Sequence, residues 1–341
     1  MGCCVVTTSL TWMNPPLMRF EMTTARKQQV CVDATPYYHC VSRCVRRSFL
    51  CGEDPLTNKS YHHRRAWVER KITTLSQIYC IDICAYAIMS NHYHLVVHIN
   101  RAKAQKLSDY EVVERWQQEH QLPALVSRWL NGQLTSKAEM EACSAIIDSW
   151  RQRLWNLSWF MKELNFDIAC QANKEDDCKG HFWESRFKSQ ALLDEKALLA
   201  AMTYVDLNPL RAGEAKTPET SDYTSIQARL EALNSEQESA PCLHPFIGAA
   251  TNERVDGIPY RLMDYIELVD WSARVYREDK ASLAESAPPI LQRLNVNQLK
   301  WLEACTKLER HRITAVGCSQ NVIHAKRMLS RKRLTLLRLD S

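Results

Sequence analysis

The sequence has few of the residues that mark disordered or membrane-spanning chains. Its 341 residues include only 8 glycines and 12 prolines, so long disordered tracts are not expected. No run approaches the roughly 18–20 consecutive apolar residues that a membrane-spanning helix needs. The short apolar run near the N-terminus has no basic segment before it, which argues against a secretory signal. The length suffices for two domains, or for one domain with a large extension.

The cysteines lack the spacing of a metal or disulfide framework. There are fourteen, but no pair of Cys-x-x-Cys motifs of the kind that zinc ribbons use. Cys40 and Cys44, like Cys80 and Cys84, are four residues apart in apolar runs, where we expect buried free thiols. Scattered thiols fit a reducing cytoplasm better than an oxidising compartment.

Positive charge is modest in total but uneven along the chain. The net charge is +5, and basic residues cluster in residues 43–70 and 326–338. Such clusters fit a polyanionic partner, nucleic acid first, although a solvated helix face gives the same pattern.

The hydrophobic pattern predicts an α+β fold. Strands are expected over residues 36–45, 81–89, 92–100 and 181–193, and helices over 61–78, 150–165 and 195–208. The order β-α-β-β-α-β is that of a ferredoxin-like, RRM-like split βαβ antiparallel sheet with packed helices. Beyond it we expect a mostly helical C-terminal extension.

Three regions follow from this order. Residues 1–29 are expected to be a poorly ordered N-terminal segment, with Met18 or Met22 as an alternative start. Residues 30–225 form the predicted catalytic domain, interrupted by a polar helical insertion at about 101–149. Residues 226–341 form the helical, basic C-terminal extension.

Two histidines separated by one residue are the first candidate site. His92 and His94 fall on a predicted strand, where residues i and i+2 share a face about 7 Å apart. Neutral imidazole is the commonest metal ligand, although an isolated pair of this kind is also compatible with structural histidines. His98 shares the face but lies roughly 13 Å along the strand from His94, too far to share one ion. Val96 excludes a His-x-His-x-His cluster.

A tyrosine on a later helix is the second candidate. Asp194 is a good N-cap for the helix that follows it, and Pro209 is expected to end that helix. Tyr204 and Asn208 are four residues apart, so we expect them to share one helix face. On spacing alone, Tyr204 is equally an aromatic at a helix–sheet boundary and Asn208 a C-terminal cap.

These residues resemble a known family. Asn91-His-Tyr-His-Leu-Val-Val97 resembles the histidine–hydrophobe–histidine (HUH) motif of single-tyrosine transposases. Tyr204-Val-Asp-Leu-Asn-Pro-Leu-Arg-Ala-Gly213 is similar to the tyrosine helix of REP-associated tyrosine transposases and their insertion-sequence relatives. The segments 38–43, 157–165 and 180–188 resemble that family's connecting blocks. The resemblance covers about residues 30–225 and gives the insertion and the C-terminal extension no role.

The resemblance implies a transposase that cleaves and rejoins single-stranded, hairpin-forming DNA. His92 and His94 match its metal ligands, Tyr204 its nucleophile, and Asn208 a third ligand where relatives often have glutamine. The expected ion is Mg²⁺ or Mn²⁺, and the expected intermediate is a 5′-phosphotyrosine. The implied partner is single-stranded or hairpin DNA, and no membrane association is implied. The protein could act as a homodimer, and the implied location is the cytoplasm, at the nucleoid.

Contacts to DNA are expected from basic and aromatic positions of the matched blocks. Trp183 and Phe187 are candidates for stacking on unpaired bases, with core packing as the alternative. The basic candidates are Arg43, Arg46, Arg47, Arg186, Lys188 and Arg211. Two other functions stay open at this point: a replication-initiator or relaxase-type HUH nuclease, and a domesticated protein that binds hairpins without transposing.

Overall fold

A six-stranded open sheet organises the chain, with strand order β2-β3-β1-β4-β5-β6. The computed structural model describes residues 29–45, 50–53, 58–235, 237, 240–248, 256–277, 287–309, 313–329 and 334–340. The predicted N-terminal segment, up to residue 28, lies outside them. Helices and strands are mixed, which agrees with the predicted α+β class. The strands are β1 (Tyr37–Arg43), β2 (Ile81–Ile88), β3 (His92–Ile99), β4 (Lys188–Leu192), β5 (Ala315–Gly317) and β6 (Leu336–Arg338).

The first four strands are antiparallel, and β1 lies between β3 and β4. In the β1–β3 ladder Val41 pairs with His94 and Arg43 pairs with His92. The predicted hairpin of β2 and β3 is confirmed, and the backbone N–H of Met89 donates to the carbonyl of His92 at 2.8 Å to close its turn. Side chains alternate between the two faces of a strand, so this register puts both histidines on one face.

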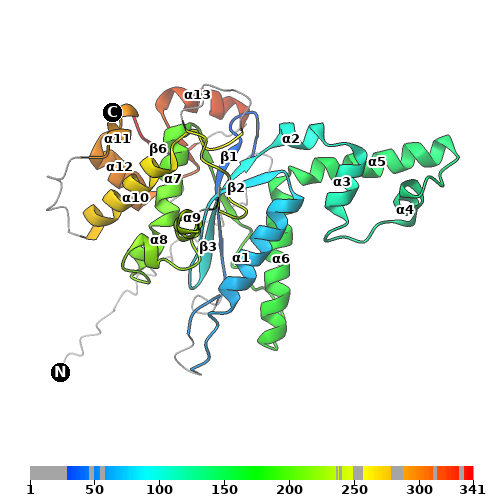
Figure 1. Ribbon diagram of the computed structural model, residues 1–341, viewed down its shortest axis with the longest axis horizontal. Coiled ribbons are helices and arrows are strands. Elements are labelled where there is room, and N and C mark those ends of the chain that lie inside the picture. The colour runs from blue at the N-terminus through cyan, green and yellow to red at the C-terminus, as the bar shows by residue number, and fades with distance from the viewer. Residues whose placement is uncertain are drawn as a thin grey trace, which may run out of the picture.

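Each face of the sheet has its own hydrophobic core. On one side, α1 (Arg64–Ile78) and α6 (Leu157–Glu175) pack over apolar side chains of β1, β2 and β3. On the other side lies α7 (Glu195–Asp206), packed against β2, β3, α10 and α12 (Figure 1). The other helices that follow α7 along the chain are α8 (Asn208–Ala212), η2 (Pro218–Thr220), α9 (Ser225–Asn234), α10 (Leu262–Arg277), α11 (Pro289–Arg293), α12 (Gln298–Lys307) and α13 (Ser319–Met328).

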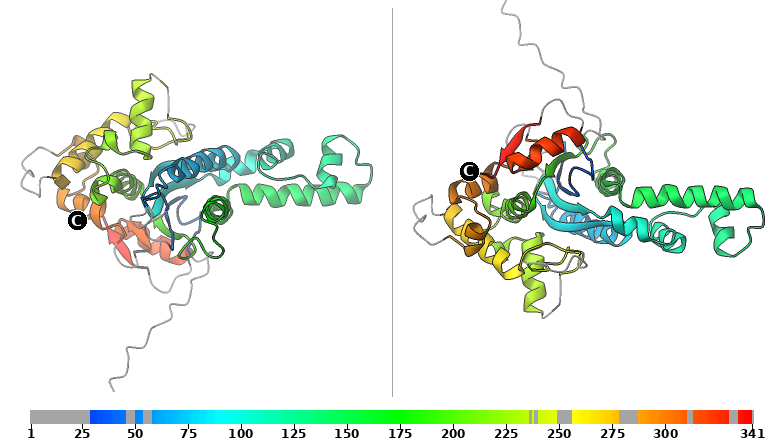
Figure 2. Two further views of the ribbon diagram at one scale, coloured as in Figure 1. Left: turned by 90° about the horizontal axis from the view of Figure 1, so that it is seen from below. Right: turned by 90° about the horizontal axis from the view of Figure 1, so that it is seen from above.

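The predicted insertion between β3 and α6 is helical. The long helix α5 extends away from the sheet, so that the outer part of the insertion lies far from it, as both views in Figure 2 show. A core of its own, which includes Val112, Cys143 and Ile147, continues into the core beneath α1. Its helices are α2 (Arg101–Lys106), α3 (Asp109–Trp116), α4 (Ala124–Leu130) and α5 (Lys137–Leu154).

The predicted single helix over 150–165 is wrong, because the chain forms two helices there. The break falls at Trp155 and Asn156, and the Asn156 side chain accepts hydrogen bonds from the backbone N–H groups of Ser158 and Trp159. This N-cap starts α6, which then continues to Glu175, beyond the predicted end of the helix at Asn165. One buried apolar stripe spans both helices, formed by Trp150, Leu154, Leu157, Met161 and Leu164.

The fourth strand is shorter than predicted. It begins at Lys188 instead of His181, and Trp183 makes only an isolated bridge with Cys44. The C-terminal extension is largely helical but adds two strands that the sequence did not predict. β5 pairs parallel to β4, and β6 pairs parallel to β5, so the extension continues the same sheet.

The four cysteines expected to be buried thiols, Cys40, Cys44, Cys80 and Cys84, are buried, and none of them forms a disulfide. In the described ranges, no helix combines the length and the apolar character required to cross a bilayer.

Candidate functional site

His92 and His94 lie on the face of the sheet that α7 covers. Their ring centroids are 4.7 Å apart, and His94 is fully buried. Burial, with smaller contributions from the charges of Arg43 and Arg211, lowers the pKa of His92 to about 3. Burial and the neighbouring His92 likewise hold the pKa of His94 well below its usual value. Both rings are therefore neutral at physiological pH and keep a lone pair for a ligand.

A chain of hydrogen bonds fixes which nitrogen of His94 carries that lone pair. The Gln190 amide donates to the carbonyls of Leu308 (2.8 Å) and Ile313 (3.0 Å), so its Oε1 faces Nδ1 of His39 at 2.6 Å. His39, whose pKa burial also lowers, donates through Nδ1 and accepts through Nε2 from Nδ1 of His94 at 2.9 Å. Nε2 of His94 is left unprotonated. It is buried, and no hydrogen-bond partner for it exists among the described residues.

Tyr204 approaches the same histidines from α7. Its ring centroid lies 5.8 Å from that of His94 and 5.9 Å from that of His39, and only 5% of the residue is exposed. The helix begins where the sequence predicted, because the Asp194 side chain accepts a hydrogen bond from the N–H of Ala197.

Arg211 lies directly on Tyr204. Its guanidinium carbon is 3.8 Å from the centre of the tyrosine ring. One of its terminal nitrogens, Nη1, donates to the carbonyls of Tyr204 and Cys305, each at 2.8 Å. This predicted DNA contact is therefore a neighbour of the tyrosine, and its positive charge favours the phenolate form.

Glu309, at the end of α12, completes the cluster. Its carboxylate lies 3.9 Å from Nδ1 of His94 and 3.9 Å from the Arg43 guanidinium. One ligand atom from each of His92, His94 and Glu309 falls within 4.8 Å of the other two. Burial raises the pKa of Tyr204 above its usual range; a hydrogen bond to Glu309 raises it further, while Arg211 opposes the rise.

The expected single helix carrying both Tyr204 and Asn208 is wrong. α7 ends at Asp206, and Asn208 is the first residue of the separate helix α8, with Pro209 in its first turn. Asn208 is 8% exposed, and its Nδ2 has no hydrogen-bond partner in the part of the chain that the structure describes. Nor does Asn208 cap a helix C-terminus, since Leu207 and Gly213 occupy those positions.

This donor set fits a divalent metal ion. Two neutral imidazoles and one carboxylate match the ligands of Mn²⁺ and Zn²⁺, and carboxylate with water suits Mg²⁺. The unpartnered Nε2 of His94 is the specific observation, because a buried nitrogen normally has a hydrogen-bond partner. Glu309 offers a third ligand.

The other predicted DNA contacts are distributed as follows. Arg43 lies at the histidine site, while Arg186 and Lys188 are exposed near the start of β4. Trp183 packs on Tyr93 and Phe182 and donates to the carbonyl of Asn165, so it is held in the core of the α6 side. Phe187 is buried as well. Arg46 and Arg47 lie outside the described residues.

Sequence reasoning missed His39, Gln190 and Glu309. His39 lies in the segment 38–43 that resembles the family's first strand. Side chains alternate between the faces of a strand, and this alternation could have indicated which face His39 occupies. Gln190 gave no such signal. Glu309 is 215 positions from His94 (309 − 94) in an extension without any assigned role, so only the packing of α12 on α7 brings it to the site.

Comparisons with known proteins gave one match. No family model matches the chain, and no curated protein matches it. A solved structure of a REP-associated tyrosine transposase bound to a REP hairpin is similar, with 13% identity and a TM-score of 0.36. The similarity covers 69% of this chain and 97% of that one. At such values we transfer no residue role from it, and the site described above rests on the chain's own geometry.

Proposed function

We propose that the protein is a metal-dependent HUH enzyme with a single nucleophilic tyrosine, which cleaves and rejoins single-stranded, hairpin-forming DNA. The observation that carries the proposal is the pairing of Tyr204 with His94. Their rings are 5.8 Å apart, they come from opposing elements, and the histidine nitrogen Nε2 has no partner in the described chain. The order of β1 to β4 supports a ferredoxin-like catalytic domain beneath this pair.

In this proposal His92 and His94 hold the ion, Mg²⁺ or Mn²⁺, with Glu309 or Asn208 as a further ligand. When bound, the ion supplies a Lewis acid that neutralises charge on a non-bridging phosphate oxygen. Gln190 and His39 hold His94 in the tautomer that presents Nε2.

Tyr204 makes the covalent bond. Its hydroxyl oxygen attacks the phosphorus, the bond to the 3′ oxygen breaks, and a 5′-phosphotyrosine and a free 3′-hydroxyl result. The phenol proton passes to the Glu309 carboxylate, and water supplies the proton that the departing 3′ oxygen takes up. Arg211 stabilises the phenolate as it forms. The free 3′-hydroxyl can later attack a phosphotyrosine and restore a phosphodiester.

Relaxase-type nucleases often use three metal-binding histidines, and the role of His39 separates the proposed site from theirs. His39 is adjacent to the pair, but Gln190 and His94 occupy its two ring nitrogens. It therefore supports His94 from behind and is not free to bind the ion. This arrangement favours the two-histidine transposase type.

Cleavage of a labelled hairpin oligonucleotide with a single-stranded flank tests the proposal. We expect cleavage with Mg²⁺ or Mn²⁺ and none with EDTA. His92→Ala and His94→Ala should each reduce the rate by at least about 100-fold, since each removes a direct ligand. His181→Ala, at an exposed histidine, is the matched control and should retain full activity. Full cleavage by either ligand variant, or in EDTA, would refute the metal assignment.

A further inference from the structure

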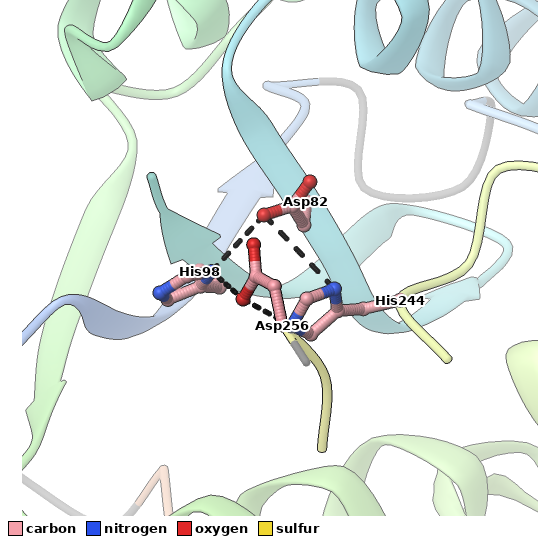
Figure 3. A group of neighbouring side chains, drawn as sticks. All are labelled: Asp82, His98, His244 and Asp256. Atoms are coloured by element: carbon pink, nitrogen blue, oxygen red, sulfur yellow. Dashed lines mark hydrogen bonds and ion pairs between the residues drawn. The ribbon is translucent and has the colours of Figure 1, made fainter. Parts of the chain in front are cut away.

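A second group of histidines and aspartates lies on the same sheet, away from Tyr204. It consists of Asp82 on β2, His98 on β3, and His244 and Asp256 from the connection between α9 and α10 (Figure 3). One ligand atom from each of the four lies within 4.8 Å of the others. None of these residues takes part in the function proposed above.

The two histidines of this cluster each lie close to both aspartates. Nδ1 of His98 lies 3.0 Å from Oδ2 of Asp82 and 3.9 Å from Oδ1 of Asp256. Nδ1 of His244 is 4.0 Å from Asp82, and its Nε2 is 3.6 Å from Asp256. Ligand atoms about 2.1 Å from a tetrahedral ion are about 3.4 Å apart. One ligand atom from each residue lies within 4.8 Å of the others, so the four side chains must move closer together to hold one ion, with a single His244 nitrogen as its ligand.

His244 shows that ion pairing alone does not account for the cluster. The residue is 4% exposed, and its Nε2 makes no hydrogen bond within the described ranges. Figure 3 shows its ring directed between the two carboxylates. Burial lowers the pKa of His244, although both aspartates oppose this. A buried imidazole with an unused nitrogen beside two carboxylates is an unsatisfied donor set for a cation.

The surrounding residues orient the carboxylates as neighbours of metal ligands do. The Asn100 side-chain oxygen caps α2 by accepting from the N–H of Lys103, which turns its amide N–H₂ toward Asp82 (3.3 Å) and Asp256. His98 and Asn100 together hold the Asp82 carboxylate in place.

We propose that Asp82, His98, His244 and Asp256 form a second divalent-metal site, of the closed four-ligand type, with Zn²⁺ as its preferred ion. Two carboxylates balance the dication, and two imidazoles add the nitrogen ligands that zinc favours over magnesium. The ion would link strands β2 and β3 to the connection that leads into α10. Because α10 packs on α7 and α12, the ion would stabilise the part of the molecule that carries Tyr204 and Glu309.

Metal titration of the full chain tests this site separately from the first. The starting protein is His92→Ala/His94→Ala, which removes the candidate catalytic ligands. We expect it to bind one equivalent of Co²⁺ with a visible d–d band, and to gain several degrees in thermal midpoint with Zn²⁺. Adding Asp256→Asn should lower the Zn²⁺ affinity at least about 10-fold. Adding His244→Gln should abolish the band.

The controls address folding. Asp256 is more than half exposed, so its variant is expected to fold even if the His244 variant does not. Asp270→Asn, at an exposed acid on α10, should leave the affinity unchanged. A folded double-histidine variant that binds no Co²⁺ or Zn²⁺ would overturn the proposal, as would undiminished binding by the Asp256→Asn variant.

Discussion

His39 donates no hydrogen bond to His94; it accepts one, from Nδ1 of His94 to its own Nε2 across 2.9 Å. Gln190 imposes this direction because its amide oxygen takes the only proton of the neutral His39 ring. The consequence is a fixed His94 tautomer whose Nε2 lone pair is available for a metal. A buried glutamine thus determines the chemistry of a histidine it does not touch.

His39→Phe tests this relay. Phenylalanine retains the ring but removes both nitrogens, so His94 loses its acceptor and its fixed tautomer. We expect Mn²⁺ affinity at the His92/His94 site to fall about 10- to 100-fold, which is the usual loss for a residue that orients a metal ligand. Isothermal titration measures it, with His181→Phe at an exposed histidine as the control. Unchanged Mn²⁺ affinity in the His39 variant would show that His39 does not orient His94 for metal binding.

Glu309→Gln tests the carboxylate at the end of α12. Glutamine keeps the size but can neither accept the phenol proton as a base nor bind an ion as an anion. We expect the rate of DNA cleavage to fall about 10²- to 10⁴-fold, the range for a lost general base. Glu303→Gln, on α12 shortly before Glu309, is the matched control, because the exposed Glu303 pairs with Lys307. Equal rates for the two variants would assign Glu309 no role.

Arg211→Met tests the cation on the tyrosine ring. Burial raises the pKa of Tyr204, and the Arg211 charge opposes that rise. Without the charge the pKa rises further, so less phenolate is present at any given pH. The rising limb of the pH–rate profile should therefore move to higher pH, with a lower rate at pH 7. Arg128→Met, on the insertion helix α4, should not move it. A profile that stays in place would contradict the electrostatic role.

Asp206, which anchors the end of α7, makes stability depend on pH. It is fully buried and accepts hydrogen bonds from Ser225, Tyr265 and the N–H of Ile226. Burial raises its pKa from 3.8 to about 6, although those hydrogen bonds oppose the rise. The folded state then holds a proton that the unfolded state releases between about pH 4 and pH 6.

Stability contributed by the protonated Asp206 is therefore present near pH 4 and is lost as pH rises through 6. A shift of this size corresponds to about 3 kcal/mol. Relative to Asp206→Asn, we expect the wild-type free energy of unfolding to decline by up to that amount between pH 4 and pH 7.5. Urea unfolding of both proteins at the two pH values measures this. A difference between them that does not vary with pH would show that the residue is ionised throughout.

Local patterns predicted the elements that carry the histidines and the tyrosine. Alternation of apolar residues located β2 and β3, and Asp194 marked the start of α7. The break at Asn156 was missed because the apolar stripe continues across it, so periodicity alone did not reveal the cap. β5 and β6 were missed because three residues are too few to show alternation.

Residues that meet only through tertiary packing were not predictable from the sequence. The spacing along the strand predicted that His98 is too far from His94 to share an ion, and the structure places His98 in a different group. The spacing did not reveal that His98 faces Asp82 and His244. Glu309 and His244 come from the extension, whose composition gives no sign of either site. Their placement depends on α12 packing over α7 and on the α9–α10 connection crossing the sheet edge.

The central claim is that Tyr204 forms a covalent bond with DNA, and trapping that adduct tests it most directly. Wild-type protein is incubated with a 3′-labelled hairpin oligonucleotide and Mn²⁺, denatured, and analysed by gel electrophoresis and peptide mass spectrometry. We predict a labelled protein band whose modified peptide contains Tyr204 as a phosphotyrosine ester. The band should be absent in Tyr204→Phe and unchanged in Tyr110→Phe, at an exposed tyrosine of the insertion. A Tyr204→Phe protein that still forms the adduct, or an adduct on another residue, would contradict the account.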